Sequence, residues 1–317
     1  MMGELLKNVT PILFLIVFGN ILRRINYFEE VAIQRITSMV ANLVIPCVIF
    51  TTFINLKLEL EHLLLAISFF VLQCLLLLVS WIIYKALRIK RRFFPFFSCV
   101  FAFGFMAVPL FSTVFGEEHM AFLVAIGVGH ELFVGIIYLT TAKLYLKSEK
   151  SSLTNIRKSL LSPLFIMIFI SLFLKGTGLD VLARENWFTS GLLTAIAKIA
   201  SMTTTLTMVI VGYRIRFNNP NRILESVGYV AFRYTLIFSL GYLFKALIFD
   251  QIVPKNIYLD YAIFTMFSQH GSVVLTAFVG EYGTQEDLEV ASNAFVLNAL
   301  VGIGLYLIFI FMISAHG

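Results

Sequence analysis

Long apolar runs alternate with short polar segments along the whole chain. A helix needs about 20 predominantly apolar residues to cross the hydrocarbon core of a bilayer. The runs of suitable length are 5–22, 32–54, 62–84, 95–115, 119–142, 160–178, 188–212, 227–249, 257–280 and 288–313. No barrel-like alternation is visible, and isolated strands cannot cross lipid. The pattern therefore predicts an all-α membrane protein with ten transmembrane helices.

The longest polar segment lies in the middle of the chain and divides the helices into two sets of five. We predict a first five-helix repeat over residues 1–146, a short cytoplasmic connector over 147–159 and a second repeat over 160–317. Because five is odd, the second set starts from the opposite side of the membrane, so the repeat is inverted. The similar phrases at Pro11–Phe14 and Pro163–Phe165 are a weak trace of it.

Composition and charge fit this class of protein. The chain is 59% hydrophobic and 13% charged, with a mean hydropathy of +0.91, which is too apolar for a soluble domain. Lys and Arg gather in the loops after odd-numbered helices, chiefly in 85–92 and 143–158, and such residues accumulate on the cytoplasmic side. We expect a multi-pass protein of the plasma membrane, with both termini outside.

Other function classes lack a supporting motif. The three cysteines lie in apolar runs without metal-ligand spacing, and no Gly-rich phosphate loop or His-Glu-x-x-His sequence occurs. No basic run lies on a soluble element, which argues against a nucleic-acid partner. We therefore expect a protein without cofactor, metal or enzymatic activity, whose partners are the lipid bilayer and a small solute.

Two runs are interrupted near their middles, at matching places in the two halves. Gly104 and Pro109 interrupt the fourth run, and Gln269-His270-Gly271 interrupts the ninth. Such a pair is the best sequence indication of a transporter's binding site. We expect a half-helix to begin at Pro109 and another near Gly271-Ser272, with positive N-termini that suit a carboxylate. The alternative is a pair of simple kinks, because Gly and Pro are common in membrane helices.

Several polar residues lie at membrane depth. Lys198 is too deep in its helix to reach the surface easily, so it is a candidate counter-charge for a carboxylate. It is alternatively a structural partner of Glu131 or faces an aqueous cleft. His130 and Glu131 are candidates for proton uptake, or else form a hydrogen-bonded contact between helices. Arg233 lies within reach of the cytoplasmic end of its helix and is expected to extend its guanidinium to that surface.

Motifs throughout the chain resemble the auxin efflux carrier family. They are Phe18–Arg24 in the first helix, Asn42–Phe50 in the second, Gly104, Pro109, Phe115 and Gly116 in the fourth, and Tyr282-Gly283 after the ninth. The resemblance implies ten helices in two inverted repeats, with broken fourth and ninth helices that cross. It also implies a scaffold of the first, second, sixth and seventh helices, often dimeric, and a mobile unit that carries substrate by an elevator-like motion.

The chain departs from this family at the crossing. Phe101 and Ala102 stand where the family usually has Gly-Asn, Gln269-His270-Gly271 stands where it has Pro, and Thr204-Thr205 replaces a Pro in the seventh helix. The short connector resembles that of bacterial members, which are associated with dicarboxylates. The substrate suggested by the resemblance is therefore a dicarboxylate or, with less support, an auxin-like acid.

The leading prediction is a secondary transporter for a small organic anion, bound where the broken helices cross. The candidate substrate-binding residues are Asn42, Phe103, Gly104, Phe105, Pro109, Lys198, Thr205, Ser268, Gln269, His270, Gly271 and Ser272. The candidates for proton or ion coupling are His130, Glu131, His270 and Asn293. The main alternative is a transport-inactive membrane sensor of the same fold, which the replaced crossing residues favour. An intramembrane enzyme is a third reading, against which the missing catalytic motif argues.

Overall fold

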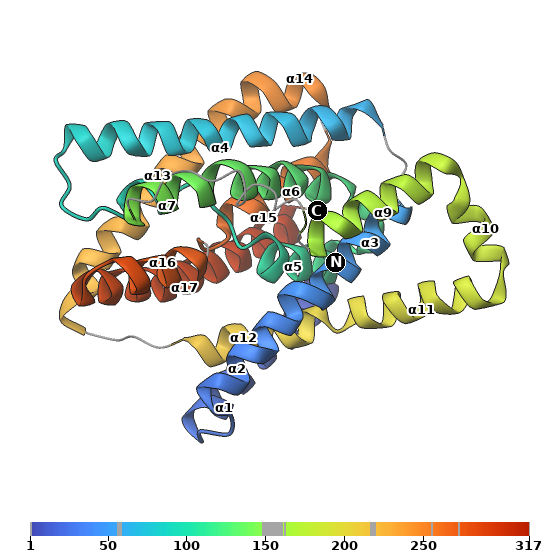
Figure 1. The fold of residues 1–317 in the computed structure, drawn as a ribbon, viewed down its shortest axis with the longest axis horizontal. Coiled ribbons are helices and arrows are strands. Elements are labelled where there is room, and N and C mark those ends of the chain that lie inside the picture. The colour runs from blue at the N-terminus through green and yellow to red at the C-terminus, as the bar shows by residue number, and fades with distance from the viewer. Residues whose placement is uncertain are drawn as a thin grey trace.

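The computed structural model describes the chain except for residues 1, 56–58, 148–160, 162, 216–219, 255, 272 and 317. The described residues form helices, turns and irregular segments and contain no strand (Figure 1). The prediction of an all-helical protein is confirmed.

The described chain is mostly α-helical, and four of its helical segments contain a π-helical turn. The α-helices are α1 (Met2–Arg24), α2 (Glu30–Met39), α3 (Ile45–Asn55), α4 (Leu60–Ala86), α5 (Val108–Phe115), α6 (Ala121–Phe133), α7 (Leu139–Lys147), α9 (Pro163–Thr177), α10 (Leu179–Glu185), α11 (Trp187–Ser201), α12 (Thr203–Arg214), α13 (Ile223–Phe244), α14 (Asp250–Ile252), α15 (Ile257–Ser268), α16 (Val273–Tyr282) and α17 (Gln285–His316). The π-turns are η1 (Val40–Val44), η3 (Phe103–Ala107), η5 (Val134–Tyr138) and η7 (Lys245–Phe249). Short 3₁₀ turns are η2 (Phe94–Phe96), η4 (Glu117–His119) and η6 (Pro220–Arg222).

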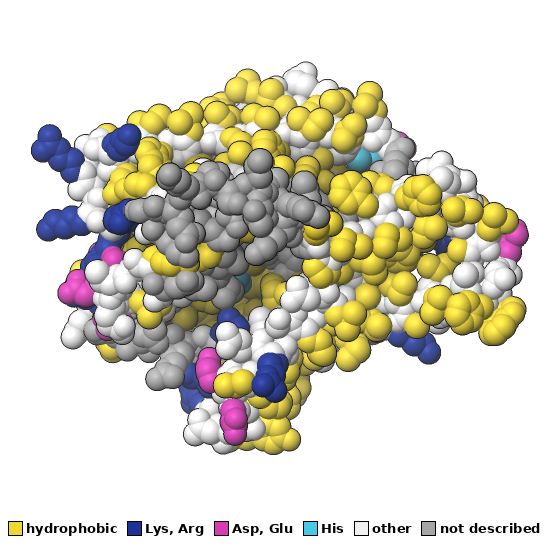
Figure 2. Space-filling view, viewed as in Figure 1, with side chains coloured by type: hydrophobic (Ala, Val, Ile, Leu, Met, Phe, Trp, Pro, Cys, Tyr) yellow, Lys and Arg dark blue, Asp and Glu magenta, His cyan; other side chains and the backbone are white. Residues whose placement is uncertain are grey.

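Several of these helices are suited to a membrane. Among the described residues, 6 helices are long and apolar enough to cross one, or up to 7 when α9 and α10 are taken as one bent span. These two helices meet at 90°, and Gly178 between them has φ +73, a conformation that favours glycine. Figure 2 shows Lys and Arg side chains gathered mainly at one end of the molecule, while apolar side chains cover the long helices.

The helices pack in two groups. In the first, α1 packs along α12, and α3 packs along both α9 and α11. In the second, α4 packs along α6, and α17 packs along α13 and α16. Except for α16 on α17, these contacts join helices that are not consecutive in the chain. The first group lies toward the lower right of Figure 1. We call them the α1/α12 group and the α4/α17 group.

Glycines allow the closest of these approaches. A Cβ on Gly212 of α12 would collide with the Ile16 carbonyl of α1, and a Cβ on Gly19 of α1 would collide with the Val209 carbonyl of α12. Gly129 of α6 lies just as close to the Ala66 carbonyl of α4. Membrane helices commonly use small residues in this way to bring backbones together.

The two interrupted runs have different breaks. In the ninth run, α15 ends at Ser268 and α16 begins at Val273, as the sequence predicts. In the fourth run, residues 97–102 are not helical and η3 begins at Phe103, continuing directly into α5. The expected start at Pro109 is therefore wrong. Pro109 lies in the first turn of α5, and we attribute its accommodation to the preceding π-turn, which relaxes the backbone where the proline N–H is missing.

An ion-pair network ties the loop after α4 to the starts of α13 and α17. The Arg91 guanidinium donates to Glu225 at 2.8 Å and to Asp287 at 2.9 Å, and Arg222 pairs with Glu286 at 2.8 Å. The hydrogen bonds that Arg91 donates to the Glu225 carboxylate, and to that of Asp287, raise the pKa of Arg91 further above its ordinary value. Arg91 therefore stays charged, and the network holds one end of the α4/α17 group together.

Candidate functional site

The two broken spans touch at their breaks. The Ala102 N–H, just before η3, donates to the His270 carbonyl, between α15 and α16, over 2.9 Å. This contact places the irregular residues of both spans at one crossing. Backbone groups freed from a helix inside a membrane must find partners in the protein or in a cavity.

Arg233 supplies many of those partners. Its guanidinium donates to the carbonyls of Phe97 at 2.6 Å, Val100 at 2.8 Å and Gln269 at 3.0 Å. It also lies 5.2 Å from the centre of the Phe101 ring. Because these oxygens come from both broken spans, one side chain of α13 joins them.

The expectation that Arg233 reaches the surface is wrong. The residue is 0% exposed and turns inward to the crossing. The physical reason is the non-helical stretch 97–102, whose carbonyls have lost their helical donors. These oxygens give the guanidinium its acceptors inside the protein, where charge-assisted hydrogen bonds are strong because water is absent.

Other buried polar side chains surround the crossing. Gln73 of α4 donates to the Cys99 carbonyl at 2.9 Å and lies 2.7 Å from Nδ1 of His130. The Tyr234 hydroxyl lies 3.1 Å from the Ser268 carbonyl and 3.0 Å from the Asn298 carbonyl. These contacts fix the ends of the breaks and make the crossing a rigid polar centre.

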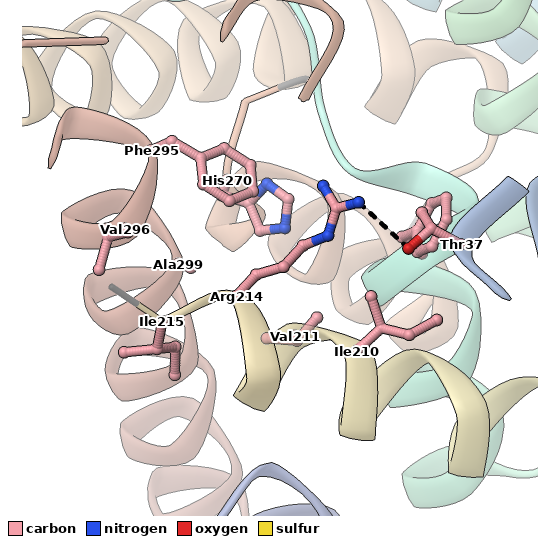
Figure 3. A pocket seen from close by; sticks show the side chains of 10 residues that line it. Thr37, Ile210, Val211, Arg214, Ile215, His270, Phe295, Val296 and Ala299 are labelled. Carbon is pink, nitrogen blue, oxygen red and sulfur yellow. Dashed lines mark hydrogen bonds between the residues drawn. The ribbon is translucent and has the colours of Figure 1, made fainter. Parts of the chain in front are cut away.

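A cavity lies beside this crossing, between the two helix groups (Figure 3). Its volume is about 80 Å³, room for roughly three water molecules. Its lining comes from several elements. Thr37 belongs to α2, Ile210, Val211, Arg214 and Ile215 belong to α12 and its C-terminal end, Phe105 belongs to η3, His270 belongs to the break between α15 and α16, and Phe295, Val296 and Ala299 belong to α17.

The polar side chains of the cavity are Arg214, His270 and Thr37. The Arg214 guanidinium donates to Thr37 Oγ1 over 3.1 Å, and its buried Nε has no partner among the described residues. Figure 3 shows this guanidinium beside the His270 ring. His270 Nδ1 donates to the Gly271 carbonyl at 2.6 Å, so in the neutral ring Nε2 is the acceptor.

The arrangement suits an anion with an apolar body. Arg214 offers a permanent positive charge with further N–H donors, and seven of the ten lining residues are apolar. The His270 ring packs edge-on against Phe295, with 4.6 Å between the ring centres. Within the described residues, no group of three His, Cys, Asp or Glu side chains is placed to hold a metal ion. The one charged group of the described lining is therefore a cation in mostly apolar surroundings.

Several residues proposed from the sequence meet at the crossing or the cavity. Phe105 and His270 line the cavity. The others that lie at or next to the crossing are Phe103, Gly104, Ser268, Gln269 and Gly271. Pro109 is buried farther along α5, and Ser272 lies outside the described residues.

Three proposed residues lie elsewhere. Lys198 is exposed on α11 and Thr205 is exposed on α12, and neither lines the cavity. Asn42 is exposed in η1, where its amide donates to the Ser38 carbonyl at 2.9 Å. In the described part of the chain, Lys198 forms no ion pair with Glu131.

The residues proposed for coupling are also dispersed. His130 is buried and accepts from Gln73 through Nδ1, whereas the neighbouring Glu131 is half-buried. Asn293 is buried in α17. The polar contact between helices, which the sequence left as the alternative for His130, is present. Proton coupling through these side chains stays a prediction.

Arg214 and Thr37 are the polar lining residues that sequence reasoning missed. Arg214 ends an apolar run on the predicted cytoplasmic side, where basic residues are ordinary. Nothing in its local sequence separates it from the neighbouring loop cations. Only the packing of α12 against α2 and the His270 break turns it toward a cavity.

No family model and no curated protein matches this chain. The function must therefore be argued from the helices, the crossing and the cavity.

Proposed function

We propose that the protein is a secondary carrier for a small organic anion, related to the auxin efflux carriers. The observation that carries this proposal is the cavity between the two helix groups, with Arg214 on one side and His270 on the other. A permanent cation next to a broken membrane span is a suitable place for an anion, and intramembrane charges generally mark transport pathways.

The packing supports ten spans arranged as an inverted repeat. In an inverted repeat, each span of the first half has an equivalent five spans later. The first span is equivalent to the sixth, the second to the seventh, the third to the eighth and the fifth to the tenth. The packing of α1 on α12 then corresponds to that of α9 on α3, and the packing of α4 on α6 corresponds to that of α13 on α17. These are among the most extensive helix contacts in the described chain. This correspondence is what two inverted five-span repeats would produce.

The same contacts support an elevator-like motion. The α1/α12 group corresponds to the first, second, sixth and seventh spans. The two broken spans meet between the groups, because α5 packs against α1 and α12 whereas α15 packs against α6, α13 and α17. A substrate held at the boundary is exposed to one side or the other when the second group moves along the first. We assign the scaffold to the α1/α12 group and place its basic loops in the cytoplasm.

The cavity favours a compact monoanion over a dicarboxylate. Among the described residues that line it, Arg214 is the one Lys or Arg side chain, and the remaining lining is mostly apolar. A second carboxylate would lose its hydration without finding a second cation. We therefore expect a single carboxylate joined to a small apolar body.

Uptake into proteoliposomes tests this function. Purified protein is reconstituted, and labelled short-chain monocarboxylates and dicarboxylates are offered in equilibrium-exchange and net-flux assays. The proposal expects saturable uptake of a monocarboxylate above that of protein-free vesicles. Binding to the purified protein without exchange or flux would instead support the sensor, and neither binding nor flux with any tested anion would contradict the proposal.

A further inference from the structure

We propose that the Arg233 guanidinium is a tethered cation, held where a carrier with broken helices would otherwise bind a coupling metal cation such as Na⁺. The inference rests on the proposed carrier function and deepens it. It assigns a positioning role to Arg233, which lies outside the cavity lining. It also predicts that the transport cycle needs no metal cation from solution.

The oxygen set around Arg233 has the composition of a cation site. In transporters, unwound backbone carbonyls and the C-terminal ends of half-helices coordinate Na⁺. Here the Phe97 and Val100 carbonyls belong to a non-helical segment, and the Gln269 carbonyl directly follows the C-terminus of α15. All three accept from the guanidinium at 2.6–3.0 Å. A positive group therefore already satisfies these oxygens.

The charge of Arg233 is not neutralised by a carboxylate. Arg233 is 0% exposed, and in the described part of the chain no Asp or Glu forms an ion pair with it. Its balancing partners are carbonyl dipoles and the face of the Phe101 ring. A buried cation without an acidic partner is costly. The geometry supports one role that would offset this cost for Arg233, which is to hold the two breaks together.

The location of Arg233 gives this role a consequence for the cycle. The residue lies on α13, which packs along α17 and against α4 and α15, and the oxygens that it binds belong to the segment after α4 and to the end of α15. The cation therefore moves together with the oxygens that it binds. Assembly of the crossing needs no ion from solution, so transport is expected to be independent of Na⁺ and of its gradient.

A merely structural Arg233 would behave differently from a tethered cation. Replacement by alanine removes the guanidinium and leaves a space among three unpaired carbonyls. If those oxygens form a latent cation site, a small cation from solution will refill that space. If Arg233 only fills volume, added cations will have no selective effect on the variant.

The test compares the wild-type protein, Arg233→Ala, Arg233→Lys and Arg222→Ala as a control. Arg222 lies in the surface ion-pair network, away from the crossing. The melting temperature of each purified protein is measured in choline chloride, in NaCl of equal ionic strength, and with millimolar methylguanidinium, far below denaturing concentrations. Uptake of a monocarboxylate is measured with and without a Na⁺ gradient.

We expect wild-type stability and uptake to be unchanged between choline and Na⁺. Uptake by Arg233→Ala should fall at least tenfold, because displaced crossing residues can reduce a rate by about 100-fold. Na⁺ or methylguanidinium should then raise its melting temperature and restore part of the uptake. Arg233→Lys, which keeps a cation, should retain more uptake without Na⁺, and Arg222→Ala should show no cation-specific response.

Wild-type uptake that depends on Na⁺ would overturn the inference. So would a foldable Arg233→Ala protein whose melting temperature responds equally to choline, Na⁺ and methylguanidinium. If Arg233→Ala does not fold, Arg233→Lys decides: uptake without Na⁺ supports the inference, and uptake lost without Na⁺ rejects it. Absence of uptake by the wild type would reject the carrier function alone, since the melting temperatures still report on the cation site.

Discussion

The Ala102 N–H donates to the His270 carbonyl over 2.9 Å and so joins the two broken spans at their breaks. This hydrogen bond places the His270 side chain, 3% exposed, against the cavity that Arg214 enters from α12. The backbone of His270 therefore belongs to the crossing and its side chain to the cavity. A substrate bound beside this ring would contact the α1/α12 group and the broken spans together.

The seam between α1 and α12 is expected to be intolerant of larger side chains. Gly212→Ala would direct a methyl group at the Ile16 carbonyl, and overpacking of this kind costs about 1–3 kcal/mol. We expect a lower melting temperature in detergent and lower transport. Gly191→Ala on α11 is the matched control, because nothing lies within 4 Å of its added Cβ. Equal stability of the two variants would contradict the close approach.

The Arg91 network is expected to stabilise one end of the α4/α17 group. Arg91→Gln breaks its bonds to Glu225 and Asp287, and the loss of hydrogen bonds to charged groups costs about 1.5–3 kcal/mol each. Solvent reduces this cost, since Glu225 is 34% exposed. We expect a clear fall in melting temperature, larger at low ionic strength than at high. Lys85→Gln is the control, because Lys85 is exposed. If Lys85→Gln loses as much stability as Arg91→Gln, the stabilisation is not specific to the Arg91 network.

Filling the cavity is expected to block the ligand with little effect on folding. Ala299 lies on α17 and lines the cavity, so Ala299→Leu would occupy part of its roughly 80 Å³. Monocarboxylate affinity, measured by calorimetry, should fall about tenfold or more, which corresponds to at least about 1.4 kcal/mol. Ala315→Leu, at an exposed position near the end of the same helix, should bind as the wild type does. Unchanged affinity in Ala299→Leu would place the ligand elsewhere.

The sequence predicts the helical class and the ninth-span break well, because apolar length and the Gln269-His270-Gly271 interruption are local signals. It misplaces the fourth-span break. Gly104 and Pro109 are the obvious helix breakers there, but the chain unwinds earlier, over 97–102. The Arg233 guanidinium stabilises this unwound stretch from another helix, and such long-range compensation has no local signature.

The lack of a local signature also explains why the sequence indicates Lys198, and not Arg214, as the cation of the site. Lys198 is the more unusual charge by depth in its apolar run, whereas Arg214 follows the ordinary rule for a cytoplasmic helix end. Depth along a helix says nothing of the direction in which a side chain points. In the structure Lys198 is exposed and Arg214 enters the cavity.

Monocarboxylate uptake by Arg214→Gln and Lys198→Gln proteoliposomes tests the central claim most directly. Each variant removes one positive charge, but only Arg214 lines the cavity beside His270. Loss of a charged partner from a buried anion costs about 3–5 kcal/mol. The account predicts that Arg214→Gln loses more than about 90% of uptake at low substrate, that Arg214→Lys recovers part of it, and that Lys198→Gln transports as the wild type does. Normal uptake by a folded Arg214→Gln protein, with uptake lost in Lys198→Gln, would contradict it.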